Sequence, residues 1–138
     1  MEKELIKATS VSTWKAAITM GCQIGYSNKQ HSIKQIHQII TAIQLEIDKL
    51  LNIKLSAKVT PCSIVFMGQE ESSVSIEFIQ YPKFQYAVND LEKAVKQFAE
   101  KLIIEAQQNR IVIVFTDKTV MMEITDQINP KIKIECKK

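Results

Sequence analysis

The stretch that decides the fold is residues 32–50, SIKQIHQIITAIQLEIDKL. Ser32 and Gln35 have the spacing of a capping box, in which each side chain satisfies a backbone group at the start of a helix. The apolar residues that follow recur at intervals of three and four: Ile33, Ile36, Ile40, Ile43, Ile47 and Leu50. This spacing predicts one amphipathic helix of about 20 residues with a single buried face.

A second helix is predicted further along the chain. Residues 89–92, Asn-Asp-Leu-Glu, have the form of a second capping signature, and Asn109 stands where a left-handed cap often ends a helix. The apolar stripe between them consists of Leu91, Val95, Phe98, Leu102 and Ala106. The most buried residues of the two helices are expected to include Ile40, Ile43, Phe98 and Leu102.

Strand-like alternation precedes and separates the helices. Residues 14–24 alternate, so that the even-numbered residues share one face. Residues 55–66 and 73–78 are predicted to form a hairpin around a turn at Gly68. Pro61 cannot donate to a ladder, so it marks an edge or a bulge.

The last predicted strands follow the second helix. Residues 111–115 are a continuous apolar run, typical of a strand that is covered on both faces or nearly so. Residues 120–124 can return beside it as a further strand. A weak alternation over residues 132–136 suggests an additional edge strand.

This order of elements predicts an α+β protein, a ferredoxin-like β-α-β-β-α-β sandwich with a C-terminal hairpin extension. Each helix has only one apolar stripe, so both must cover the same face of a mostly antiparallel sheet. The other face is expected to be half polar, with Lys15, Ala17, Thr19, Gln23 and Ser75. One domain is predicted over residues 13–138, preceded by a flexible arm at residues 1–12.

The bulk composition is that of an ordinary globular domain. The chain has 138 residues, of which 46% are apolar and 24% charged. A net charge of +3 is small beside the basic stripe of a dedicated nucleic-acid binder. No targeting core or membrane span is evident. The sequence therefore predicts a cytoplasmic protein without a membrane partner, and a nucleic-acid partner is not expected.

Residue types suited to catalysis are scattered. The three cysteines are too widely spaced to indicate a disulfide framework or a zinc site. Cys22 and His31 could pair as nucleophile and base, but Cys22 falls on the buried face of its strand. Nucleotide-binding loops and the common hydrolase motifs are absent. No catalytic residue, metal or cofactor is predicted, and an enzyme is the less supported function.

Ligand-binding residues are predicted first in the loop before the first helix. Residues 26–31 precede a helix N-terminus, where backbone N–H groups favour anions. The candidate ligand-binding residues here are Tyr26, Asn28, Lys29 and His31. The alternative is a solvated loop in which Ser32 only caps the helix.

Two further segments extend this prediction. Tyr81, Lys83 and Phe84, followed by Tyr86, offer stacking surfaces for a planar ring beside a cation. The alternative is a connector whose aromatic side chains close the end of the sheet. Arg110 is the only arginine and could hold a phosphate through its bidentate fork. It could also pair only with a nearby carboxylate.

The segments Tyr81–Phe84, Gln108–Arg110 and Thr119–Glu123 resemble those of small uncharacterised ferredoxin-like proteins of bacteria, prophages and mobile elements. The resemblance covers residues 18–123 and implies the fold, with no activity to transfer. Small phage proteins of this size include sponges that sequester nucleotide signals. This is an analogy at the level of fold.

The function predicted from these features is a non-catalytic, homo-oligomeric binding protein that holds a small anionic ligand such as a nucleotide. Self-association is expected because the open sheet face is half polar and Val120–Ile124 is strongly apolar. The alternative is a protein-interaction or inhibitor module that uses the open sheet face.

Overall fold

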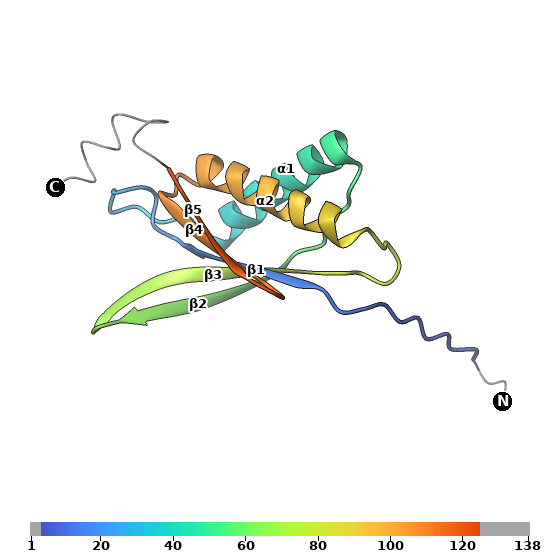
Figure 1. Cartoon of the computed structure of the whole chain (residues 1–138). Helices are drawn as coiled ribbons and strands as arrows, with labels where there is room; N and C mark the ends of the chain where they lie inside the picture. Colours follow the sequence, from blue (N-terminus) through green and yellow to red (C-terminus); the bar gives the residue numbers. More distant parts are fainter. Residues whose placement is uncertain (1–3, 125–138) are drawn as a thin grey trace.

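A computed structural model describes residues 4–124 of the chain. Its elements are β1 (Lys15–Gly21), α1 (Ile33–Leu51), β2 (Lys58–Phe66), β3 (Gln69–Ile79), α2 (Val88–Glu105), β4 (Arg110–Phe115) and β5 (Thr119–Glu123). The strands form one antiparallel sheet in the order β2-β3-β1-β4-β5. Both helices lie on the same side of this sheet (Figure 1). The predicted α+β fold with a C-terminal hairpin is confirmed.

Helix α1 begins as its sequence predicts. The Ser32 hydroxyl accepts a hydrogen bond from the Gln35 backbone N–H, and the Gln35 side chain accepts one from the Ser32 N–H. The buried residues of α1 are Ile36, Ile40, Ile43 and Ile47. The two ends of the predicted stripe are wrong, because Ile33 and Leu50 are exposed. At 100° per residue, Ile33 and Leu50 fall on the two margins of the stripe, and the four buried isoleucines form its centre.

Helix α2 differs from its prediction at both ends. It starts at Val88 after Ala87, which makes no side-chain cap, so Asn89–Glu92 is no capping signature and lies within the first turn. The left-handed residue after the helix is Gln107, with φ of 52°, and Asn109 does not take this role. Gln108, which follows this turn, is buried just before β4 begins.

The predicted core is confirmed in both helices. Ile40 and Ile43 of α1 are buried, and Phe98 and Leu102 of α2 are fully buried. Phe98 packs edge-to-face on Phe78 of β3, with ring centroids 5.0 Å apart. This packing fixes α2 on the sheet.

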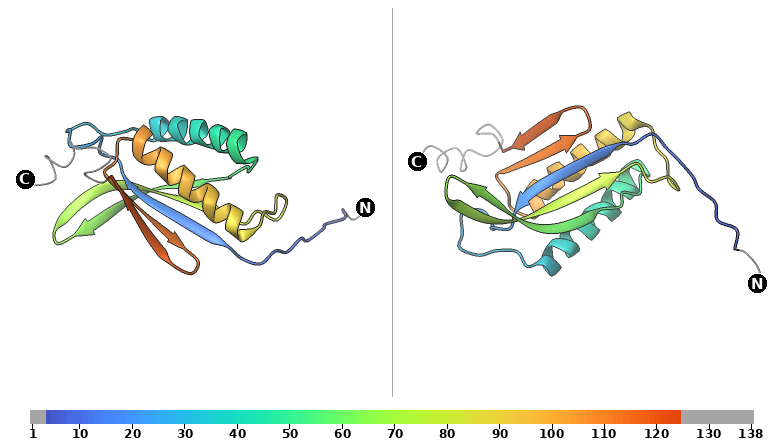
Figure 2. Two further views of the ribbon diagram at one scale, coloured as in Figure 1. Left: turned by 45° about the horizontal axis from the view of Figure 1, so that its top comes forward. Right: turned by 90° about the horizontal axis from the view of Figure 1, so that it is seen from below.

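The β2–β3 hairpin is longer than predicted and turns at Met67 and Gly68. Both residues have positive φ, 51° and 83°, as a two-residue type I′ turn requires. Pro61 lies in β2 at the edge of the sheet, in agreement with the prediction that it marks an edge. The hairpin projects past the helices (Figure 2).

The prediction that β4 is covered on both faces is wrong. Ile111, Ile113 and Phe115 face the helices and are buried, whereas Val114 on the opposite face is exposed. The reason is that both helices cover the same side of the sheet. The strand suggested at residues 132–136 lies outside the described residues. Within residues 4–124, no helix is both long and apolar enough to cross a membrane.

Candidate functional site

The open face, defined as the sheet face opposite the helices, carries the unusual polar arrangement of this protein. Residues that pair across antiparallel strands point to the same side of the sheet. Pairing places Gly21 beside Ser73, and Ser73 beside Cys62. By the same alternation Glu71 of β3 points to the open face, and its neighbour Glu70 points to the other face.

Gly21 makes room for the Glu71 carboxylate. A Cβ atom added to residue 21 would overlap the Oε1 atom of Glu71, and it would lie 3.9 Å from Oε1 of Gln108. The carboxylate therefore rests on the backbone of β1 because residue 21 has no side chain. We call Gly21, Glu71, Ser73 and Gln108 the Gly21 site.

Gln108 anchors this site to the end of α2. Its side chain is largely buried, and its Nε2 donates to the carbonyl oxygens of Gln23, at 2.9 Å, and Ala106, at 3.1 Å. Its backbone N–H donates to the Ile103 carbonyl. The site thus has a rigid side at Gln108 and an exposed side at Glu71.

The Glu71 carboxylate is free of protein ion pairs and hydrogen bonds within the described part of the chain. By contrast, Glu123 on the same face is paired with Arg110. At this end of the open face, the Glu71 carboxylate is therefore the acidic group that can bind a positively charged ligand group.

Cys22 is unsuited to nucleophilic catalysis. Its side chain is buried, and burial raises the pKa of its thiol, with smaller contributions from nearby Cys62 and Glu71. A raised pKa keeps the thiol protonated at neutral pH, and the thiolate is the reactive form. The His31 ring is held at the end of α2, because its Nε2 donates to the Ala106 carbonyl at 2.9 Å.

The loop before α1 lies at the same end of the sheet as the Gly21 site. Gly25 donates its N–H to the Gln107 carbonyl, and Ser27 bonds the Ile24 carbonyl. Tyr26, Asn28 and Lys29 are exposed on this loop. The Ser32 capping box occupies the Ser32 and Gln35 N–H groups, and an anion subsite at this helix start stays a prediction.

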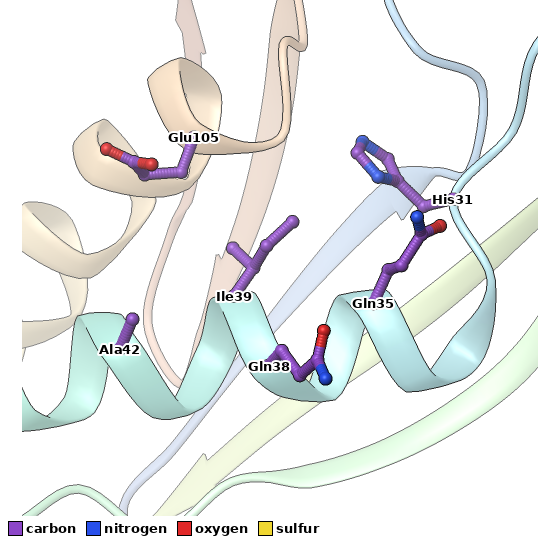
Figure 3. Close-up of a pocket in the computed structure, with 6 residues that line it drawn as sticks. All are labelled: His31, Gln35, Gln38, Ile39, Ala42 and Glu105. Atoms are coloured by element: carbon purple, nitrogen blue, oxygen red, sulfur yellow. The ribbon is translucent and has the colours of Figure 1, made fainter.

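His31 also borders a shallow groove of about 370 Å³ between α1 and the end of α2 (Figure 3). The groove is lined by His31, Gln35, Gln38, Ile39, Ala42 and Glu105. It lies on the helical layer, away from the open face. Among residues 4–124, no three His, Cys, Asp or Glu side chains are grouped so as to hold a metal ion.

Arg110 forms an ion pair with a carboxylate of the neighbouring strand. Its Nε donates to the Glu123 carboxylate at 3.2 Å across the β4–β5 pair, and both side chains are largely exposed. Arg110 lies near the end of β1 that carries Gly21, because Thr19 pairs with Val112. A ligand role for Arg110 stays a prediction.

Tyr81, Lys83 and Phe84 lie at the opposite end of the sheet. Tyr81 and Phe84 stack on each other with ring centroids 5.9 Å apart, and both are partly exposed. They follow Ile79, which pairs with Lys15 at the start of β1. A strand of seven residues separates the two ends by roughly 20 Å. A single site combining Arg110 with these aromatics is therefore wrong within one chain, and remains a prediction only across two chains.

Tyr86 is structural. Its hydroxyl accepts the Lys54 N–H at 3.0 Å, and its backbone exchanges two hydrogen bonds with the Gln80 side chain. These bonds fix the connection between β3 and α2, as the alternative interpretation of this segment proposed.

Sequence reasoning missed Gly21, Glu71 and Gln108. The sequence pattern of residues 68–71 predicts a solvated turn. No local sequence pattern predicts that Glu71 approaches Gly21. The alternation of β3 does hold a signal, because Glu71 has the same parity as Ser73 and Ser75 and so belongs to the open face.

No protein-family model matches the chain, and no curated protein matches it by sequence. Among solved structures it is similar to a phage SAM lyase in the apo state, with a TM-score of 0.69 and 16% identity. A phage SAM lyase in complex with S-methyl-5′-thioadenosine gives a TM-score of 0.63 and 15% identity. Each match covers 88% of this chain and 97% of the other. At these identities the likeness establishes the fold.

These matches correct the functional prediction. A purely non-catalytic binding protein is contradicted, because the solved proteins that share this fold almost end to end are named as lyases. The predicted resemblance is confirmed in its coarser part, since the matched structures are small phage proteins of this fold.

Proposed function

We propose that this chain cleaves S-adenosylmethionine and that the Gly21 site holds the amino-acid end of this substrate. The observation that carries the proposal is the shared fold with a lyase that binds S-methyl-5′-thioadenosine. The Glu71 carboxylate on the open face supplies the charge that such a substrate needs.

The proposed reaction needs few functional groups from the protein. S-adenosylmethionine carries a sulfonium, so breaking the bond from sulfur to the γ-carbon of the amino-acid chain releases neutral S-methyl-5′-thioadenosine. The substrate's own carboxylate oxygen can attack that carbon while the electron pair of the breaking bond passes to sulfur. The second product is then a five-membered lactone, and neither water nor a proton is consumed.

An enzyme for this reaction acts mainly by orientation. The reactive conformation of the substrate, with its carboxylate behind the γ-carbon, is rare in solution. A protein that holds the substrate in this conformation accelerates the reaction, because well-oriented internal reactions gain many orders of magnitude in rate. A protein nucleophile and a general base are unnecessary on this route. The scattered catalytic residue types in the sequence are compatible with such a mechanism.

Glu71 is best placed on the ammonium group of the substrate. The sulfonium loses its charge during cleavage, so a carboxylate beside it would stabilise the substrate more than the transition state. The ammonium keeps its charge throughout. A carboxylate bonded to it fixes the chain without opposing the reaction, and Gln108 forms the rigid side of the site.

The ligand proposed here differs from the predicted nucleotide. S-adenosylmethionine has no phosphate, and its amino-acid end presents two positive charges and one negative charge. A phosphate contact by Arg110 is therefore not required, in keeping with the pairing of Arg110 to Glu123.

The test is product analysis in H₂¹⁸O by mass spectrometry. We expect S-methyl-5′-thioadenosine together with the lactone, and homoserine formed from the lactone should carry ¹⁸O in its carboxyl group. Label in the homoserine hydroxyl would show that water attacks the γ-carbon, which contradicts the lyase route. No product above the spontaneous rate would contradict the proposal as a whole.

The variant Gly21→Ala should lower activity while the protein stays folded. The added Cβ must displace the Glu71 carboxylate, and a misplacement of about 1 Å can cost about 100-fold in rate. The melting temperature should change little, because the displaced group is the end of an exposed side chain. Gly21 also lacks the positive φ that would strain alanine.

Ser75→Ala serves as the control, since Ser75 lies on the same face two residues along β3 from the partner of Gly21. The kcat/KM of both variants is compared with that of the unmodified protein. Full activity in Gly21→Ala would show that the position of Glu71 does not matter.

A further inference from the structure

The backbone carbonyl of Ala106, at the end of α2, accepts hydrogen bonds from two side chains. One comes from the His31 Nε2 atom at 2.9 Å, and the other comes from the Gln108 Nε2 atom at 3.1 Å. A carbonyl oxygen has two lone pairs, so both donors can bind it at once. Ala106 is fully buried. His31, in the loop before α1, and Gln108, in the Gly21 site, therefore share one buried acceptor.

The orientation of the Gln108 side-chain amide follows from its partners. Its Nε2 atom lies 2.9 Å from the Gln23 carbonyl and 3.1 Å from the Ala106 carbonyl, and both carbonyls can only accept. A reversed amide would set its oxygen against these two oxygens without any hydrogen between them. The Oε1 atom of Gln108 is therefore held on the side of Gly21, 3.9 Å from the position of a Cβ atom added there.

His31 joins the two segments that carry these carbonyls. Gln23 belongs to the loop before α1, and Ala106 belongs to the end of α2. The backbone N–H of His31 donates to the Cys22 carbonyl at 2.8 Å, next to Gln23, while the His31 ring reaches Ala106. The ring therefore helps to fix the spacing between the two acceptors of the Gln108 amide.

The His31 ring also separates the Ala106 carbonyl from the groove between α1 and α2. The ring is half-buried, and Figure 3 shows it at one end of this groove, near Gln35. A smaller or apolar side chain at position 31 leaves the carbonyl without its second donor. Water from the groove can then compete with the Gln108 amide for this acceptor.

We propose that His31 is a positioning residue, which holds the Gln108 amide through the Ala106 carbonyl with the amide oxygen turned to the Gly21 site. The effect on catalysis rests on the proposed function, in which Glu71 binds the substrate ammonium and Gln108 forms the rigid side of the site. An ammonium group has three N–H donors, so it can bind the Gln108 oxygen together with the Glu71 carboxylate.

Hydrogen exchange measured by NMR tests the position of Gln108 without substrate. Both side-chain N–H protons of Gln108 should be protected in the unmodified protein, because each has a carbonyl partner. His31→Leu removes the ring donor and should speed their exchange by about 10-fold. His31→Gln supplies an N–H donor again and should restore most of the protection. Unchanged exchange in His31→Leu would contradict the proposal.

His37→Leu is the matched control, because His37 is the other histidine of the chain and is exposed on α1. His37 does not line the groove, so exchange at Gln108 should stay unchanged in this variant. An equal effect of both leucine variants would overturn the role of His31. If circular dichroism shows that His31→Leu does not fold, His31→Ala takes its place in the same comparison.

Steady-state kinetics separates positioning from a general loss of stability. In His31→Leu, kcat for S-adenosylmethionine should fall by about 10-fold while KM changes by less than about threefold, because Glu71 still binds the ammonium. His31→Gln and His37→Leu should keep nearly the kcat of the unmodified protein. An unchanged kcat in His31→Leu would overturn the catalytic role of His31. No turnover by the unmodified protein would instead contradict the proposed function, and the exchange of the Gln108 protons would still decide whether His31 positions this amide.

Discussion

Replacing Phe98 with alanine should lower the free energy of unfolding by about 3–5 kcal/mol. Phe98 is fully buried and meets Phe78 edge-to-face, so the variant loses apolar contacts and leaves a cavity between α2 and the sheet. Domains of this size have a total stability of about 5–15 kcal/mol. The change therefore removes a large part of the stability, and urea denaturation followed by circular dichroism measures it.

Phe84→Ala is a matched control in the same chain. Phe84 is about half exposed and stacks only on Tyr81, so its loss should cost about 1 kcal/mol. Equal losses at positions 84 and 98 would mean that the buried face of α2 is misassigned. If the Phe98→Ala protein does not fold, Phe98→Leu gives the same ranking against Phe84→Leu.

The helices could be predicted because their information is local. A stripe at intervals of three and four identifies the buried face within one segment, and the capping box at Ser32 fixes the start of α1. The ends of the elements depended on neighbours, as at Ala87 and Gln107. The exposure of Val114 also depends on neighbouring elements, because both helices cover the other face of the sheet, and the local apolar run could not indicate this.

The relative positions of the predicted site residues followed from the topology that the sequence had already indicated. Strands β1 and β3 are antiparallel, so the connection after β3 lies at the start of β1. Arg110, at the start of β4, lies instead near the end of β1. The predicted fold thus already separated Arg110 from Tyr81 and Phe84 within one chain.

The Gly21 site depends on strand register, which local sequence patterns do not reveal. Gly21 and Glu71 are 50 positions apart, and they meet only because β1 and β3 pair in one particular register. A slip of one residue would turn Glu71 to the other face. Parity could place Glu71 on the open face, but only the register places it over the glycine.

Glu71→Gln should lower kcat/KM for S-adenosylmethionine by about 10- to 100-fold. The substitution keeps the size of the side chain and removes its charge, and a hydrogen bond to a charged group contributes about 1.5–3 kcal/mol. Glu71 is exposed and has no protein partner among the described residues, so the fold should not depend on it.

Glu70→Gln makes the same chemical change one residue earlier, on the opposite face of β3. It therefore has the same effect on net charge and should keep nearly full activity. Circular dichroism of both variants confirms that any difference is not a folding defect.

The most direct measurement is the rate of S-methyl-5′-thioadenosine formation from S-adenosylmethionine by the unmodified protein, Glu70→Gln and Glu71→Gln side by side. The account predicts turnover by the first two proteins and a loss of about 10- to 100-fold in the third. Equal rates for the two variants would remove the Gly21 site from the reaction, and no turnover by the unmodified protein would contradict the proposed function itself.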